Sequence, residues 1–309
     1  MTAGVERRRI LDRGLWLDWR KHDITASDLG ALAGVDPYKT RLQLYLEKTG
    51  VTPPAGETNL MRRGRWLEAA TMTALREALP DWRFEKANVY LRNPVLQLGA
   101  TPDVVAEPAG EKTLVNIQLK AIGRPTFERE WQDGVPLRYE LQTLAEGMLM
   151  GADANMVAVL VIDTYSADLE LFDVKRHAAA EKRIRAMATA FWQDIAEGRR
   201  PAADYERDAE VIAQLYPQSV PEPVLDLSGD NRLAELLPVR AACKEEVAAI
   251  EAKLKVIDVE IKDKMGEHEL ATLDGWKLSW KTQHIAEHVR AATTRRPLLV
   301  TEIKAEDGE

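Results

Sequence analysis

The chain has 309 residues and a formal net charge of −8, with 45% hydrophobic and 30% charged residues. This length is enough for one large core, or for a core domain with an appendage. Its one cysteine, Cys243, excludes an intramolecular disulfide framework and a cysteine-rich metal site, and it favours a reducing cytoplasm. No run of about 18 apolar residues is present, so we expect no helix that spans a membrane and no membrane partner. The acidity argues mildly against a protein that coats DNA through general charge.

The first 50 residues have a helical pattern. Thr25 or Ser27 can cap a helix that stops near Gly34, and a second helix is expected over 41–48, before Gly50. A longer helix is expected from residue 61 to residue 79, where Pro80 ends it.

The apolar period then changes from helical to alternating. Four strands are expected, at 89–91, 95–98, 104–106 and 114–121. In the last of these, polar residues alternate with apolar ones: Asn116, Gln118 and Lys120 stand between Val115, Ile117, Leu119 and Ala121. One face of this strand should pack on a core while the other presents two amides and an amine.

The next segments continue the α/β pattern. A helix is expected over 137–150, strands over 156–162 and 169–174, and a further helix over 178–197. We therefore predict an α/β fold with a mixed central sheet flanked by helices over residues 1–200, followed by a linker or short helices over 201–235.

Residues 236–309 are expected to form a C-terminal extension of a heptad helix, a β-hairpin and a tail. The heptad positions are Cys243, Val247, Ile250, Leu254, Ile257 and Ile261. Such a seam is typical of a packing element within a chain or between subunits. Asp274-Gly275 is a hairpin turn signal, and Trp276 and Trp280 follow it. Tryptophans paired with lysines can stack on bases, but we interpret these two as core residues.

Four side chains in the core suggest one kind of chemistry. Glu68 lies on the long helix, Asp103 begins a strand, and Gln118 and Lys120 share a strand face. Hard divalent cations prefer oxygen ligands, which the carboxylates, the Gln118 amide and the backbone carbonyl of Leu119 can supply. Such a cation activates water and neutralises charge on a phosphate, and a lysine nearby can stabilise the attacked phosphate.

Each of these features alone has an ordinary structural explanation. A Pro-Asp pair is usually a turn, an alternating lysine usually faces solvent, and a helical glutamate is usually a surface residue. Tyr139 and Gln142, three residues apart on one helix face, could simply decorate that helix. The order of the set is what favours phosphodiester hydrolysis.

These ordered motifs resemble those of the PD-(D/E)xK nucleases and, within them, the lambda-exonuclease-like, YqaJ-type phage recombinases. The resemblance covers roughly residues 15–200. In chain order it involves Trp19-Arg20, Ile24-Thr25-Ala26-Ser27, Pro37-Tyr38-Lys39-Thr40, residues 44–50, Gly64 to Glu68, Thr101-Pro102-Asp103, Gln118-Leu119-Lys120, and Tyr139 with Gln142.

The resemblance implies a role for each residue of the predicted site. Position 118 would bind Mg²⁺, with Mn²⁺ as an alternative, together with Glu68 and Asp103. Lys120 would be the catalytic lysine, and Gln142 would help to order the site. The expected DNA-contacting residues are Arg20, Ser27, Thr25 and Tyr139, with Arg20 and Ser27 on the terminal 5′ phosphate. A helix N-terminus is a suitable phosphate cradle, although Ser27 could equally serve only as a helix cap.

The same resemblance implies a biological setting. The enzyme would digest one strand of duplex DNA from its 5′ end, in the cytoplasm of a bacterial host, and would be of phage or prophage origin. It would act as a homo-oligomer, commonly a ring of three subunits, with a single-strand annealing protein as its partner.

Position 118 departs from the pattern, because the family usually has a carboxylate there. Glutamine keeps an oxygen but loses the charge, so metal binding should weaken. Either the lineage tolerates Gln118, or it is an inactivating substitution, or the chain binds DNA without cutting it. Two alternatives to the exonuclease therefore stay open: an endonuclease of the same fold, and a scaffold that binds DNA ends.

Overall fold

The structure is a computed structural model that describes residues 4–53, 56–284 and 296–300. It divides into two compact units, Met1–Tyr216 and Pro217–Glu309. None of the helices in the described ranges is long and apolar enough to cross a membrane.

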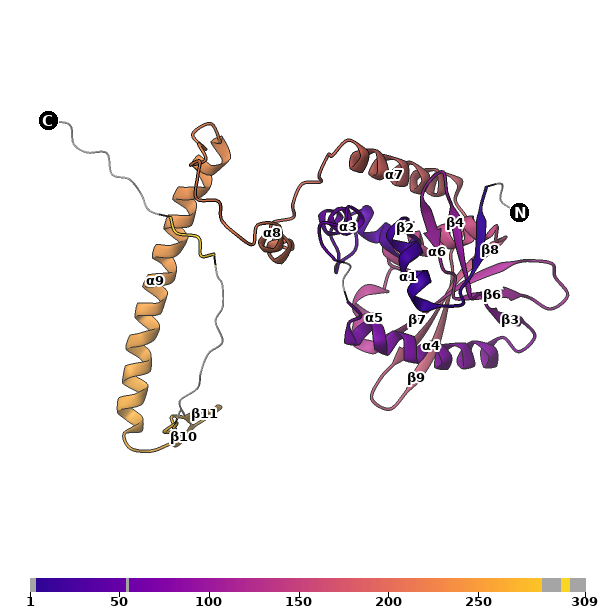
Figure 1. Ribbon diagram of the computed structural model, residues 1–309. Coiled ribbons are helices and arrows are strands. Elements are labelled where there is room, and N and C mark those ends of the chain that lie inside the picture. The colour runs from indigo at the N-terminus through magenta and orange to yellow at the C-terminus, as the bar shows by residue number, and fades with distance from the viewer. Residues whose placement is uncertain (1–3, 54–55, 285–295, 301–309) are drawn as a thin grey trace. The chain divides into compact units, whose positions relative to one another are not determined.

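The larger unit is built on a five-stranded mixed sheet with the order β3-β6-β7-β8-β9 (Figure 1). Its strands are β3 (Arg83–Lys86), β6 (Val104–Glu107), β7 (Val115–Gly123), β8 (Ala154–Ile162) and β9 (Ala167–Asp173). Strands β7 and β8 run parallel, and the other neighbours pair antiparallel. The predicted α/β fold, a mixed sheet flanked by helices, is therefore confirmed.

Helices cover both faces of this sheet. They are α4 (Asn59–Ala78), α5 (Arg124–Glu130), α6 (Leu137–Met150) and α7 (Ala178–Ala196). Leu75 of α4 packs on Ile117 and Leu119 of β7, whereas α6 and α7 bury their apolar faces with Val157 and Val159 of β8. Because β7 is covered on both sides, its residues are set between two helical layers.

A second sheet, with the order β1-β4-β5-β2, holds the N-terminal segment. Its strands are β1 (Glu6–Arg9), β4 (Val89–Asn93), β5 (Leu98–Ala100) and β2 (Ile24–Thr25). The short helical elements beside it are α1 (Arg13–Lys21), η1 (Ala26–Asp28), α2 (Leu29–Leu32) and α3 (Arg41–Lys48), and α8 (Ala209–Leu215) follows α7.

Two local predictions are wrong, and two elements were not predicted. The first residues form strand β1 rather than helix, because Glu6–Arg9 pairs with the edge of β4. The strand expected over 95–98 is a turn, in which the Asn93 side chain accepts from the N–H groups of Val95 and Leu96, and only Leu98 belongs to β5. Strand β3 and helix α5 were not predicted.

The polar face of β7 presents Asn116, Gln118 and Lys120, and most of it is covered by α6. Asn116 is fully buried and Gln118 is 3% exposed, whereas Lys120 is half-buried. Glycine at position 147 makes this packing possible. A Cβ atom there would lie 1.7 Å from the Asn155 side-chain oxygen.

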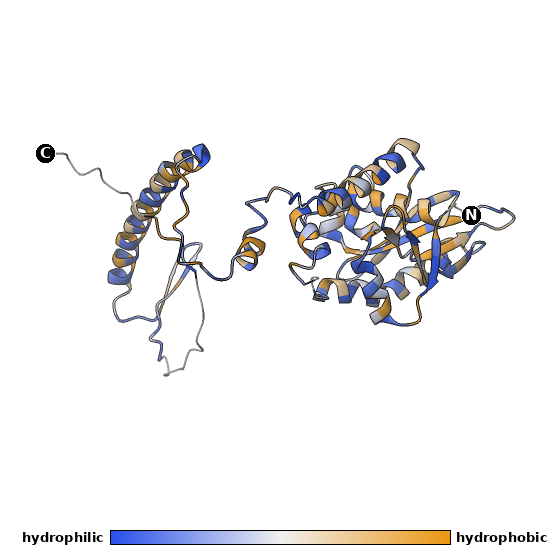
Figure 2. Ribbon diagram, turned by 45° about the horizontal axis from the view of Figure 1, so that its top comes forward, coloured by the Kyte–Doolittle hydropathy of each residue, from blue (hydrophilic) through white to orange (hydrophobic). Residues whose placement is uncertain are grey.

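The smaller unit holds the long helix α9 (Asn231–Met265) and the hairpin of β10 (Leu270–Leu273) and β11 (Trp276–Ser279). In Figure 2 hydrophobic and hydrophilic residues alternate along α9. Among the heptad residues, Ile250 is 63% exposed and Ile257 is 52% exposed. Trp276 and Trp280 are 71% and 47% exposed, so the interpretation of both as core residues is wrong. Of the expected tail after Thr282, residues 285–295 and 301–309 lie outside the described residues.

Candidate functional site

A pocket of about 400 Å³ opens between α4, the start of β6, the second half of β7 and the first turn of α6. Six of the residues predicted for the site line it: Glu68, Asp103, Gln118, Leu119, Lys120 and Tyr139. Gln142 lies behind the pocket wall, in hydrogen-bond contact with two of these side chains. The three N-terminal residues Arg20, Thr25 and Ser27 form a separate cluster.

Strand register explains why Asp103 and Gln118 meet. In the antiparallel pair of β6 and β7, Val104 lies opposite Ile117, so the residue before Val104 lies beside the residue after Ile117. The Gln118 Nε2 atom donates a short hydrogen bond to Oδ2 of Asp103. The backbone N–H of Leu119 donates to the same oxygen, over 2.9 Å.

The electrostatic state of Asp103 indicates a site that favours a cation. Burial raises the pKa of Asp103 to about 6, and the negative charge of Glu68 adds to this effect. The charge of Lys120 and the N–H of Leu119 act in the opposite direction and do not compensate. A cation beside Asp103 would lower this pKa again and so favour its charged form.

Behind these groups, α6 supplies a network of amides and a carboxyl. Gln142 donates through Nε2 to Gln118 Oε1 over 3.0 Å and to Glu146 Oε1 over 2.9 Å. Its Oε1 accepts from Lys120 Nζ over 3.3 Å. The one amide of Gln142 thus connects Gln118, Lys120 and Glu146.

Lys120 is placed by an aromatic ring as well as by Gln142. Its Nζ lies 4.8 Å from the centre of the Tyr139 ring, and the Arg138 guanidinium lies 4.4 Å from the same ring centre. Both cations line the pocket. Glu68, in contrast, forms an ion pair of 3.3 Å with Lys86 on β3.

The donor set fits a hard divalent cation with few protein ligands. No group of three or more His, Cys, Asp and Glu side chains suited to a metal ion occurs among the described residues. Asp103 and Glu68 nevertheless line one pocket, and Mg²⁺ characteristically uses one or two carboxylates with water and substrate phosphate. The Gln118 amide presents its nitrogen to Asp103, so it could act as a ligand only after its oxygen turned to this side.

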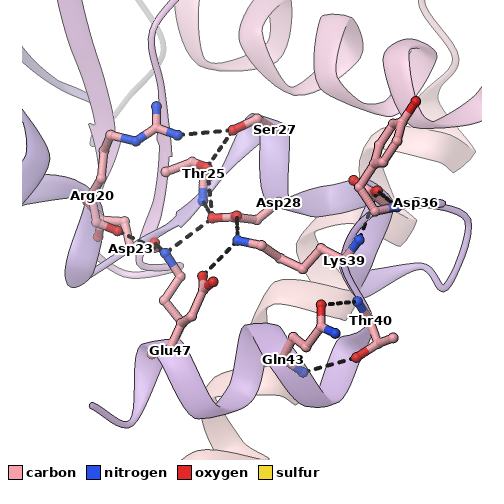
Figure 3. Close-up of polar contacts among 12 residues, drawn as sticks. Arg20, Asp23, Thr25, Ser27, Asp28, Asp36, Lys39, Thr40, Gln43 and Glu47 are labelled. Carbon is pink, nitrogen blue, oxygen red and sulfur yellow. Dashed lines mark hydrogen bonds and ion pairs between the residues drawn. The ribbon is translucent and has the colours of Figure 1, made fainter. Parts of the chain in front are cut away.

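The N-terminal cluster centres on Arg20 and Ser27 (Figure 3). Arg20 donates to Ser27 Oγ over 3.2 Å, and Ser27 shares a 2.9 Å hydrogen bond with Thr25 Oγ1. Ser27 is exposed, whereas Thr25 is 2% exposed. Arg20 and Ser27 can therefore meet a ligand from solvent, and Thr25 positions Ser27 from below.

An ionised carboxylate anchors this cluster. Thr25 donates to Asp28 through both its N–H and its Oγ1, which makes Thr25 rather than Ser27 the cap of η1. Burial opposes the ionisation of Asp28, but the charges of Lys48, Lys39 and Arg20 outweigh burial and hold its pKa well below the usual range. Lys39 also pairs with Glu47 at 2.7 Å (Figure 3).

The expectation of a helix N-terminus as phosphate cradle is not met. Residues 26–32 form a three-residue 3₁₀ turn and a four-residue helix, which is too short for a strong helix dipole. Any affinity of this cluster for an anion must come from its side chains, chiefly Arg20.

Trp16 connects the two clusters. The Arg20 guanidinium lies 4.7 Å from the centre of the Trp16 ring. The Nε1 atom of Trp16 donates to Thr101 Oγ1 over 3.0 Å, two residues before Asp103. One tryptophan thus braces both the basic cluster and the segment that carries the pocket carboxylate.

Several polar residues of this region were not predicted. Arg63, Arg65 and Arg138 line the pocket beside the predicted groups. Glu146 is 1% exposed and lies on the same face of α6 as Gln142, four residues further along. Its spacing of seven residues from Tyr139 and four from Gln142 places it on their helix face, is visible in the sequence and could have revealed it.

Comparison with known proteins bears on the same segment. Residues 15–152 match the family described as the YqaJ-like viral recombinase domain. The Bacillus subtilis (strain 168) protein called "Uncharacterized protein YqaJ" is 24% identical over 290 residues, which are 88% of this chain and 84% of that protein. The resemblance to the YqaJ-type recombinases is thereby confirmed.

Solved structures include two exonucleases to which this chain is similar. An alkaline exonuclease from Laribacter hongkongensis is 16% identical, with a TM-score of 0.46 over 65% of this chain and 100% of that one. A phage-related exonuclease from Haemophilus somnus 129PT is 9% identical, with a TM-score of 0.39 over 57% and 96% of the two chains.

Proposed function

We propose that this chain is a divalent-metal-dependent exonuclease that degrades one strand of linear duplex DNA from a 5′ end and leaves 3′ single-stranded tails for annealing. The observation that carries the proposal is the pocket in which Glu68 of α4, Asp103 before β6 and Lys120 of β7 converge. The match of residues 15–152 to a viral recombinase domain supports a role in recombination.

The residues that would hold Mg²⁺ or Mn²⁺ are Asp103 and Glu68, with the Leu119 carbonyl and the Gln118 oxygen as weaker neutral ligands. The raised pKa of Asp103 supports this assignment, because a half-buried carboxylate beside another carboxylate gains most from a cation. When bound, the metal would polarise the scissile phosphate and lower the pKa of an attacking water.

The protein side chains would do the remaining work. Lys120 is held by the Gln142 oxygen and the Tyr139 ring, so its ammonium group has a fixed place in the pocket. There it would donate to a non-bridging phosphate oxygen and offset the charge that develops during attack. Arg63, Arg65 and Arg138 on the pocket wall would hold flanking phosphates.

Arg20 and Ser27 would recognise the terminal 5′ phosphate. The Arg20 guanidinium donates a hydrogen bond to Ser27. The whole cluster contains three cations, Arg20, Lys39 and Lys48, and two carboxylates, Asp28 and Glu47. Three cations against two carboxylates leave one positive charge for an anion. Recognition of this end group is what would separate an exonuclease from an endonuclease.

Two features concern partners. The exposed apolar residues of α9, among them Ile250 and Ile257, support assembly into a homo-oligomer, for which a ring of three subunits is the family's common form. A single-strand annealing protein is the partner that would use the 3′ tails. A scaffold that binds DNA ends without cutting is the second candidate, and the direction of the Gln118 amide favours it.

The test compares linear duplex DNA with a 5′ phosphate, the same duplex with a 5′ hydroxyl, and closed circular duplex, each with Mg²⁺ or Mn²⁺. The proposal expects nucleotide release from the phosphorylated linear DNA alone. Cutting of the circle would make the chain an endonuclease. Binding to ends without cleavage by either this chain or the Gln118→Glu variant would leave the scaffold.

A further inference from the structure

Glu146 is a buried carboxyl group to which the proposed mechanism gives no role. It is 1% exposed, it lies on α6, and it does not line the pocket. A buried carboxyl usually costs stability unless hydrogen bonds satisfy both of its oxygens. Here Oε1 accepts from Gln142, but Oε2 has no hydrogen-bond partner among the described residues.

Several buried polar atoms around Glu146 lack hydrogen-bond partners among the described residues, which is unusual for a purely structural group. The Asn116 side chain lies beside the carboxyl, and its own Oδ1 is buried without a partner, as is the Nδ2 of Asn155. Glu146 Oε2 and Asn116 Oδ1 are thus two buried acceptors without a donor, which is unfavourable for folding. A neutral Glu146 would supply the missing proton, and burial together with the charge of Asp103 does raise its pKa, to about 8.

What Glu146 does accomplish is to select one direction for the Gln142 amide. Its Oε1 requires a donor, so the NH₂ end of Gln142 faces Glu146 and Gln118. The oxygen end of Gln142 is then left for the Lys120 ammonium. If the amide were reversed, its NH₂ group would face the Lys120 ammonium and its oxygen would face the acceptor oxygens of Gln118 and Glu146, so both Gln118 and Lys120 would have to move.

We propose that Glu146 is a positioning residue for phosphodiester hydrolysis: it fixes the direction of the Gln142 amide, and that amide fixes Lys120 and Gln118 in the pocket. The inference rests on the proposed function. It extends the active centre one helical turn inward, to a carboxyl that contacts neither metal nor DNA. Groups that orient direct ligands in this way typically change activity by about 10- to 100-fold.

Two substitutions of Glu146 separate positioning from structure. Glu146→Gln keeps an oxygen acceptor for Gln142, so it should retain cleavage within about threefold of the wild type. Glu146→Leu keeps the volume but removes the acceptor. It should lower kcat by about 10- to 100-fold with little change in KM, while the melting temperature stays the same or rises.

Met148→Ala is the matched control on the same helix. Met148 is 3% exposed in the apolar core and makes none of the polar contacts described above. This variant should lose melting temperature and keep kcat when it is assayed well below its melting point. Glu146→Leu should therefore lose kcat and keep its melting temperature, whereas Met148→Ala should lose melting temperature and keep kcat.

A third measurement does not depend on cleavage. The side-chain NH₂ signal of Gln142, identified by its absence from a Gln142→Met spectrum, should be protected from hydrogen exchange in the wild type and in Glu146→Gln. It should lose that protection in Glu146→Leu.

The results decide between the claims. Equal kcat for the wild type and Glu146→Leu would overturn the positioning role, as would a Glu146→Gln variant as slow as Glu146→Leu. If the wild type cleaves no DNA with either metal, the proposed function fails, and protection of the Gln142 amide alone decides whether Glu146 orients it. Unchanged protection in Glu146→Leu would then refute the inference.

Discussion

Gln118→Glu is the substitution that tests the pocket most directly. In the structure the NH₂ group of Gln118 donates to Asp103, and its oxygen accepts from Gln142. A glutamate of the same shape can still accept from Gln142, but it places a third carboxylate beside Asp103 and Glu68. Without metal this variant should be less stable by roughly 2–4 kcal/mol, because a buried hydrogen bond is replaced by repulsion between charges.

With metal the balance should reverse. At an effective dielectric constant of about 20, one added charge about 4 Å from a divalent ion gains about 8 kcal/mol, and repulsion from two carboxylates about 5 Å away removes about 6 to 7 kcal/mol. The metal-bound variant is then more stable than the metal-bound wild type by about 1–2 kcal/mol. Because the metal-free variant is less stable by roughly 2–4 kcal/mol, the metal affinity should rise by about 3–6 kcal/mol, or at least about 100-fold. We expect Gln118→Glu to bind Mn²⁺ more tightly and to cleave faster than the wild type at limiting metal.

The assay combines a titration of melting temperature against Mn²⁺ with nucleotide release from 5′-phosphorylated linear duplex. Gln132→Glu, an exposed position outside the pocket, is the charge-matched control. It should change neither the metal dependence of the melting temperature nor the cleavage rate. If Gln118→Glu matches this control in both measurements, residue 118 does not face the metal and the assignment of the pocket is incorrect.

Four further outcomes are expected. Lys120→Met should lower kcat by about 100- to 1000-fold while DNA binding persists in a gel-shift assay, because one charged donor to the phosphate is lost. Arg20→Gln should reduce the preference for a 5′ phosphate over a 5′ hydroxyl by about 10- to 100-fold, measured as the ratio of the two cleavage rates, since a charge-assisted hydrogen bond contributes about 1.5–3 kcal/mol. The pKa of Glu146 is raised from 4.5 to about 8, so the folded state binds the proton more tightly than the unfolded state. The stability that results is fully present below pH 4.5 and is lost as the pH rises through 8. Over this range, urea unfolding of the wild type should show a decrease of a few kcal/mol in the free energy of unfolding, and Glu146→Gln should not show it. Ile257→Asp, at an exposed seam position of α9, should reduce the mass measured by light scattering if that seam joins subunits, and unchanged mass would exclude this role.

Sequence periodicity was sufficient to predict the helix and strands that surround the pocket. The helix predicted over 137–150 coincides with α6, and the strands expected over 104–106 and 114–121 lie within a residue or two of β6 and β7. These segments have long, regular patterns, and their packing agrees with their local preference. The strand expected over 95–98 failed because the Asn93 side chain forms a turn there with two backbone N–H groups, and this overrides the apolar pattern.

The residues that line the pocket could be predicted from the sequence, whereas the burial of their strand face could not. Motif order brought Glu68, Asp103 and Lys120 together, and the structure places all three around one pocket. The burial of the β7 polar face was not predictable, because alternation of polar and apolar residues looks the same beside water and beneath a polar helix face. The strand face is buried because α6 supplies hydrogen-bond partners for it: Gln142 donates to Gln118 and is itself bonded to Glu146.

The same network explains how glutamine can occupy position 118. The NH₂ end of Gln142 faces two acceptors, one on residue 118 and one on Glu146, and a carboxylate at 118 would accept from it equally well. The network is therefore arranged for an oxygen at this place, whichever residue supplies it. What glutamine adds is a donor toward Asp103, where a cation would otherwise neutralise that half-buried carboxylate. Metal binding must then compete with an internal hydrogen bond, so the wild-type chain should need more metal than Gln118→Glu to reach the same rate of cleavage.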